Sequence, residues 1–124
     1  MKLLSICIPV YNEEEFINKC VQNIIDCKKL GLDFEIIISD GNSTDRTRSI
    51  LKKLNHPNVK CFFRDSNDGK GSNILNALSQ VSKNSDIVLF QDADLEYSPD
   101  DYEDLLKPII SGYADIVYGT RFAR

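Results

Sequence analysis

The feature that most constrains the fold is the alternation of short apolar runs with segments of helical periodicity. The apolar runs lie at residues 3–8, 34–39, 59–64, 86–91 and 115–118. Between them, apolar side chains recur at helical spacing within residues 16–25, 44–54, 74–81 and 98–111. Strands that alternate with helices are typical of α/β proteins, in which helices cover both faces of a mostly parallel sheet. The 124 residues therefore predict one α/β domain with five strands.

Local signals predict where several elements begin and end. Pro9 follows the first apolar run and is expected to close the first strand. Asn12 is expected to cap the first helix, with the acidic run Glu13–Glu15 in its first turn. Lys70 lies between two glycines at the expected start of the third helix.

Composition argues against several classes of function. The formal net charge of −4 argues against a nucleic-acid groove, which needs clustered Lys and Arg. No apolar stretch approaches the roughly 20 residues that span a bilayer, so no transmembrane segment is expected. The cysteines form no CxxC pair, which argues against a zinc site; they are Cys7, Cys20, Cys27 and Cys61. Free thiols suit a reducing compartment, and a cytoplasmic location is expected.

Polar residues follow the strands at the points where ligands usually bind. In open parallel sheets, ligands lie beyond the carboxyl ends of the strands. The groups at these positions are Pro9–Glu13, Asp40–Asn42, Asp92–Glu96 and Gly119–Arg121. Carboxylates occur in three of them and a cation in the fourth, so we expect these side chains to share one edge of the sheet.

The strongest single signal is the sequence Asp92-Ala93-Asp94. In an extended segment, residues two apart point the same way, so Asp92 and Asp94 can converge on one cation, and Glu96 continues the alternation. Carboxylate oxygens suit Mg²⁺ or Mn²⁺, which also bind phosphate oxygens. The alternative is that these are solvated loop acids, but two unpaired carboxylates at the end of a buried strand would repel each other.

Other residues at this edge have a ligand role and a structural role open to them. Asp40 can cap the following helix or accept hydrogen bonds from a ribose or base. Tyr11 can stack on a base or cover the sheet, and Glu13 can contact ligand or favour the helix N-terminus. Lys70 can neutralise phosphate together with backbone amides. Arg121 can pair with a diphosphate or lie in solvent.

Two other protein classes with an acidic sheet edge fit the sequence less well. A receiver domain would need an acidic pair after the first strand and a Lys after the last, where this chain has Pro9–Asn12 and Thr120–Arg121. An Asp-X-Asp phosphatase would carry that motif on its first strand, whereas here it follows the fourth.

Five segments in order resemble the motifs of family-two glycosyltransferases, in particular the dolichol-phosphate-mannose-synthase-like branch. They are Ser5–Glu14, Ser39–Thr47, Gly69–Gly71 with the helix at Asn76–Leu78, Asp92–Asp100 and Ala114–Phe122. The resemblance covers essentially the whole chain. It implies a GT-A fold, a Rossmann-like domain for nucleoside-diphosphate sugars, and inverting transfer of the sugar.

The resemblance also implies which residues bind the donor, a UDP-sugar or GDP-mannose. The residues expected at the nucleotide and diphosphate are Pro9, Tyr11, Glu13, Asp40, Lys70, Asp92, Ala93 and Arg121. Asp94, with Asp92 and Glu96, is expected to hold Mg²⁺ or Mn²⁺. No residue stands out as a catalytic base.

The chain departs from the family pattern in two ways. Gly41 stands where many members have a second Asp. Members also continue well past the Gly-Thr-Arg-Phe segment to build the acceptor side, so residues 1–124 are expected to form a domain truncated after its fifth strand. The expected acceptor is a polyprenyl phosphate at the cytoplasmic membrane face, or a glycan. The alternative is a non-catalytic fragment, or a nucleotide-binding module that another chain completes.

Overall fold

The computed structural model describes residues 2–93 together with 103, 104, 106 and 107. Its elements are β1 (Leu3–Val10), α1 (Ile17–Asp26), β2 (Asp33–Asp40), α2 (Thr47–Lys52), β3 (Val59–Phe63), α3 (Lys70–Ser79) and β4 (Ile87–Phe90). The predicted strand at 115–118 and most of the predicted helix at 98–111 lie outside the described residues. For the first four strands and three helices, the predicted alternation is confirmed.

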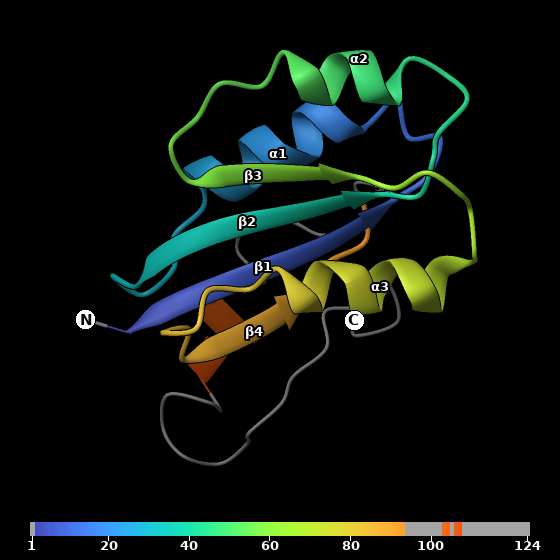
Figure 1. Ribbon diagram of the computed structural model, residues 1–124. Coiled ribbons are helices and arrows are strands. Elements are labelled where there is room, and N and C mark those ends of the chain that lie inside the picture. The colour runs from blue at the N-terminus through green and yellow to red at the C-terminus, as the bar shows by residue number, and fades with distance from the viewer. Residues whose placement is uncertain (1, 94–102, 105, 108–124) are drawn as a thin grey trace.

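The described strands form one parallel sheet with the order β3-β2-β1-β4 (Figure 1). The first strand of the chain, β1, therefore lies between β2 and β4. All four carboxyl ends meet at one edge, on the right in Figure 1. The loops that follow β1, β2 and β4 start from this edge, which brings the predicted ligand-binding groups together.

Both faces of the sheet are buried, because helices cover each of them. On one face, Leu4, Ile6 and Ile8 of β1 belong to a core cluster with residues of α1 and α2. On the other, Cys7 and Ile37 pack with Ala77 of α3. Alternate residues of a strand point to opposite faces, so strands buried on both faces are apolar throughout. This explains the apolar runs and confirms the predicted α/β architecture.

Pro9 does not close the first strand, which continues to Val10. The pairing of β1 with β4 ends at Cys7, whose carbonyl accepts from Gln91 N, while the pairing with β2 runs on to Val10. Residues two apart in a strand point to the same neighbour, so Pro9 faces the side on which pairing with β4 has ended. Its missing N–H therefore costs no ladder hydrogen bond there.

Asn12 does not cap α1, and this correction concerns the loop that borders the functional edge. The helix begins at Ile17, and residues 13–16 form a turn in which Ile17 N donates to Glu13 O. Asn12 adopts a left-handed backbone with φ of 51° and directs its side chain toward the loop after β2. Asn tolerates this conformation better than most residues, because its short polar side chain can form local hydrogen bonds.

The described helices are short. The longest, α1 and α3, have 10 residues each. In the part of the chain that the structure describes, no helix combines the length and the apolar character that a membrane span requires.

Candidate functional site

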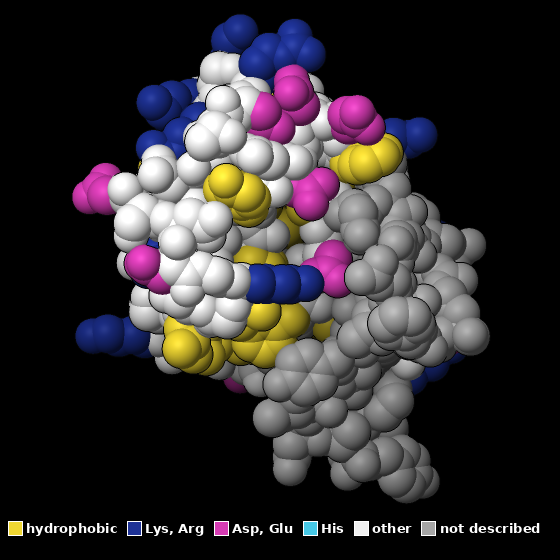
Figure 2. Space-filling view, turned by 90° about the vertical axis from the view of Figure 1, so that its right-hand side faces the viewer, with side chains coloured by type: hydrophobic (Ala, Val, Ile, Leu, Met, Phe, Trp, Pro, Cys, Tyr) yellow, Lys and Arg dark blue, Asp and Glu magenta, His cyan; other side chains and the backbone are white. Residues whose placement is uncertain are grey.

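A pocket of about 350 Å³ opens at the carboxyl edge of the sheet, between the end of β1, the start of α3 and the end of β4. Figure 2 looks onto this edge and shows acidic side chains around a patch of hydrophobic ones. The residues lining the pocket are Pro9, Val10, Tyr11, Glu13, Asn67, Gly69, Lys70, Asn73, Asp92 and Ala93.

The pocket brings together residues that are distant in the sequence and that the motifs singled out. Those present in its lining are Pro9, Tyr11, Glu13, Lys70, Asp92 and Ala93. Asp40 is not in the lining, and Asp94, Glu96 and Arg121 lie outside the described residues. Contact of these residues with a nucleotide stays a prediction. It requires that they lie at one place, and six of them do line the same pocket.

Lys70 and Asp92 are joined across the pocket by an ion pair. The distance from Lys70 Nζ to Asp92 Oδ1 is 2.6 Å, and the two side chains are 64% and 32% exposed. Lys70 is the first residue of α3, after Gly69, whose φ of 95° favours glycine. A cation and the N-terminal amides of a helix of 10 residues thus face the pocket from the same place.

The structure describes one of the three predicted metal ligands. The carboxylate of Asp92 is partly exposed at the pocket, which Glu13 also lines, and hard oxygen donors of this kind fit Mg²⁺ or Mn²⁺. Within residues 2–93 and the four later described positions, no three His, Cys, Asp or Glu residues converge as a metal site. Asp92 therefore fits as one ligand, and the metal stays a prediction.

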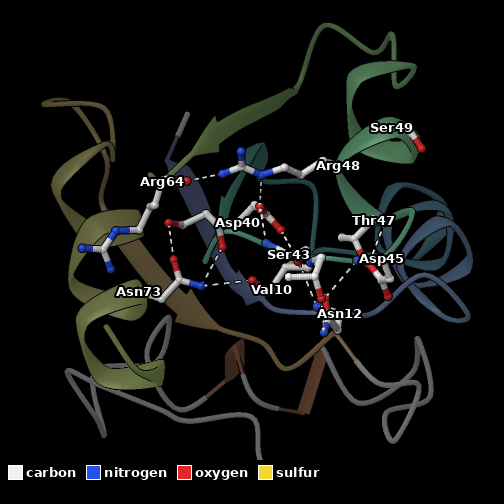
Figure 3. Close-up of polar contacts among 12 residues, drawn as sticks. Val10, Asn12, Asp40, Ser43, Asp45, Thr47, Arg48, Ser49, Arg64 and Asn73 are labelled. Atoms are coloured by element: carbon white, nitrogen blue, oxygen red, sulfur yellow. Dashed lines mark hydrogen bonds and ion pairs between the residues drawn. The ribbon is translucent and has the colours of Figure 1, made fainter. Parts of the chain in front are cut away.

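Asp40 is fully buried and serves the loop after β2 (Figure 3). Its Oδ2 accepts from Ser43 N at 3.1 Å and from Arg48 Nε at 2.6 Å, and its Oδ1 accepts from Ser43 Oγ at 2.5 Å. Arg48 also donates to the backbone carbonyl of Arg64. The predicted capping of the following helix is wrong, because α2 begins at Thr47 without a side-chain cap and Asp40 instead accepts hydrogen bonds from Ser43 and Arg48. Contact of Asp40 with a nucleoside stays a prediction.

A second network joins the loop after β1 to the loop after β2 (Figure 3). Asn12 Oδ1 accepts from Thr44 N at 2.8 Å, and Asn12 N donates to Ser43 Oγ at 2.9 Å. Glu13 N donates to Thr47 Oγ1 at 2.9 Å. Burial opposes the charge of Asp45, but hydrogen bonds from Thr47 outweigh this and lower the Asp45 pKa. These contacts fix the backbone beside Tyr11 and Glu13, which line the pocket.

Comparison with known proteins identifies the family. The sequence matches the model of Glycosyl transferase family 2 over residues 5–124.

The chain belongs to glycosyl transferase family 2.

Among relatives in this family, the undecaprenyl-phosphate 4-deoxy-4-formamido-L-arabinose transferase of Photorhabdus laumondii is 34% identical over 99% of this chain and 38% of its own length. The dolichol-phosphate mannosyltransferase of Pyrococcus furiosus is 32% identical over 98% of this chain and 34% of its own length. The structure of Staphylococcus aureus TarS 1–349 in complex with UDP-GlcNAc superposes with a TM-score of 0.70 and 30% identity, covering 90% of this chain and 32% of TarS. The predicted family and GT-A fold are confirmed, and the chain spans about a third of these relatives.

The side chain of Asn73 occupies the space beside Gly41. Asn73 is 4% exposed; its Oδ1 accepts from Ser39 Oγ at 2.6 Å, and its Nδ2 donates to Ser39 O at 2.8 Å and Val10 O at 3.2 Å. A Cβ atom at Gly41 would lie 3.2 Å from that Nδ2. The amide of Asn73 therefore fills the space next to position 41, which an Asp side chain would have to enter.

Sequence reasoning missed Asn73 and Asn67 as pocket residues. Asn73 lies on α3, and a polar residue of an amphipathic helix is expected to face solvent. Its position one turn after Lys70 is the signal that could have found it, because residues three apart share a helix face.

Proposed function

We propose that this chain forms the donor-binding part of a metal-dependent glycosyltransferase and takes a nucleoside-diphosphate sugar into the pocket between β1, α3 and β4. The observation that carries the proposal is the convergence of Tyr11, Lys70 and Asp92 on one pocket at the carboxyl edge. This is the edge at which open α/β sheets bind nucleotides. Because the chain spans about a third of its relatives, the sugar-transfer step is proposed for a protein of their full length.

Each of the three residues suits a different part of the donor. Tyr11 is 43% exposed and offers a ring face for the nucleoside. Lys70, with the first amides of α3, offers positive charge to the diphosphate. Asp92, with Asp94 and Glu96, would hold the metal. When bound, a divalent ion supplies positive charge to the diphosphate as it leaves.

The relatives supply the most specific suggestions for the substrates. TarS is described in complex with UDP and with UDP-GlcNAc, so a UDP-sugar is the first donor to test, with GDP-mannose as the second. The relatives named as undecaprenyl-phosphate and dolichol-phosphate transferases support a polyprenyl phosphate as acceptor. A phosphate oxygen is already ionised and needs no general base, which suits a sequence in which no such base stands out. Such an acceptor would place the protein at the cytoplasmic membrane face.

Calorimetric titration tests the proposal directly. The chain is titrated with UDP, GDP and their sugars, in Mn²⁺ or Mg²⁺ and then in EDTA. Metal-dependent binding is expected, and Asp92→Asn should weaken it at least about tenfold, because a charged ligand is lost.

The matched control is Asp33→Asn, which removes one charge from an exposed residue at the start of β2, on the opposite edge of the sheet. It should leave binding unchanged. A folded chain that binds none of these nucleotides would contradict the proposal and favour a non-catalytic fragment.

A further inference from the structure

The ion pair between Lys70 and Asp92 joins two groups that the proposed function gives to different partners. Lys70 is assigned to the diphosphate and Asp92 to the metal, yet their charged atoms lie 2.6 Å apart. We propose that Lys70 is an exchangeable internal cation: it neutralises Asp92 while the pocket lacks nucleotide, and it moves to the diphosphate when the donor binds. This inference rests on the proposed function and adds an order to the binding of its two ligands.

The exchange follows from competition for one carboxylate. A divalent ion on Asp92 would lie next to the ammonium of Lys70, and two cations at such a distance repel each other strongly. Without nucleotide, a metal ion must therefore displace Lys70 into solvent. A diphosphate carries more negative charge than a carboxylate and attracts the ammonium away, which leaves Asp92 available.

The surroundings of Lys70 allow its side chain to move while its backbone stays in place. The side chain is 64% exposed and flexible. One turn later in α3, Asn73 is fixed to β1 and β2 by its three side-chain hydrogen bonds. Rotation of the Lys70 side chain is therefore sufficient for the exchange.

The described residues include two other charged groups near the pocket. Arg64, at the end of β3, donates to Ser72 Oγ at 2.9 Å and pairs with Asp68 at 3.3 Å. Glu13 lines the same pocket and adds negative charge to it. Among the ion pairs that the structure describes, the pair Lys70–Asp92 is the one formed by two pocket-lining residues.

The consequence is positive coupling between metal and nucleotide. Wild-type chain should bind Mn²⁺ weakly alone and at least about fivefold more tightly with saturating UDP, and UDP affinity must rise by the same factor with Mn²⁺. Lys70→Gln removes the internal cation, so Mn²⁺ alone should bind more tightly than to wild type and the coupling should fall.

The experiment is calorimetric titration of Mn²⁺ into the chain with and without UDP. Lys70→Arg keeps a cation at this position and should retain the coupling. Lys53→Gln removes one charge from an exposed residue at the C-terminal end of α2 and should behave as wild type. Circular dichroism verifies that each variant is folded.

The outcomes separate the inference from the function on which it rests. If wild type binds UDP with Mn²⁺ but Lys70→Gln binds Mn²⁺ alone no more tightly than wild type, the exchange is wrong and the donor site stands. If folded wild type binds neither UDP nor GDP with Mn²⁺, the proposed function fails and the exchange fails with it.

Discussion

Asn73 shows how much one buried amide contributes at the functional edge. Its three hydrogen bonds join α3 to β1 and β2. Asn73→Ala leaves the groups of Ser39 and Val10 without these partners, so the free energy of unfolding should fall by about 2–3 kcal/mol. Urea unfolding measures this. Asn76→Ala, which removes one hydrogen bond to Ser39 Oγ, should cost about 1 kcal/mol, and an equal loss in both variants would contradict the assignment.

A side chain at position 41 is expected to destabilise the fold less when Asn73 is shortened. In Gly41→Ala, the new Cβ lies 3.2 Å from Asn73 Nδ2, and the hydrogen bonds of that amide prevent it from moving away. The substitution should destabilise wild type by about 1 kcal/mol and have a smaller effect in the Asn73→Ala background. A double-mutant cycle by urea unfolding measures the coupling between positions 41 and 73. Additive effects of the two substitutions would contradict a direct contact between the new Cβ and the Asn73 amide.

The pocket residues differ in how far sequence could predict them. Tyr11 and Asp92 follow strands that end at the carboxyl edge, and Lys70 begins the helix that starts there. Topology alone therefore brings the three residues together. Whether Asp40 faces a ligand or its own loop depends on where Arg48 and Ser43 place their donors, and no spacing rule gives this. The same applies to Asn73, whose role depends on the distance between α3 and the sheet.

At the scale of elements, Glu35 fixes the segment between α3 and β4 to the amino edge of the sheet. It is 5% exposed; Oε2 accepts from Ser5 Oγ and Ser82 N, and Oε1 accepts from Ser82 Oγ and Lys60 Nζ. Burial alone would raise its pKa, but these hydrogen bonds outweigh it and lower the pKa to about 2. The folded state thus holds Glu35 ionised more strongly than the unfolded chain does.

The stability that Glu35 contributes should therefore depend on pH. Since its pKa is lowered on folding, the contribution is complete above the ordinary value of 4.5 and is lost as the pH falls toward 2. Glu35→Gln should reduce the free energy of unfolding by about 2–3 kcal/mol at pH 7 and by much less near pH 2.5.

Urea unfolding across this pH range makes the measurement. Lys60→Gln is the control; because Lys60 is 47% exposed, its loss should cost less than about 1 kcal/mol. A difference between wild type and Glu35→Gln that does not change with pH would contradict the role of the ionised carboxylate.

The order of elements was predictable because both faces of the sheet are buried, which makes its strands apolar. The boundaries were less predictable, because tertiary contacts set them. The strand β1 continues through Pro9, since pairing on the side of β4 has already ended. The helix α2 begins at Thr47 instead of residue 44, because Ser43 and Thr44 bind Asn12.

At the scale of the whole molecule, ligand binding should appear as thermal stabilisation. A donor that binds only the folded chain stabilises it by about 2.7 kcal/mol at a hundredfold excess over Kd. For a domain of this size, that raises Tm by roughly 10 °C. Differential scanning fluorimetry with UDP-GlcNAc and Mn²⁺ measures the shift, which EDTA should remove. A similar shift with UDP-GlcNAc in the absence of metal would contradict metal-dependent binding.

The central position of β1 has a consequence for how the chain acquires its structure. Of the described strands, β1 is synthesised first, and it pairs with β2 and also with β4, whose register joins Leu4 to Ile87. One edge of β1 therefore stays unpaired until the residues of β4, which are synthesised much later, become available. Long-range parallel pairing of this kind is intrinsically slow and leaves intermediates prone to aggregation. During synthesis, this half-assembled sheet is the species that chaperones would need to protect.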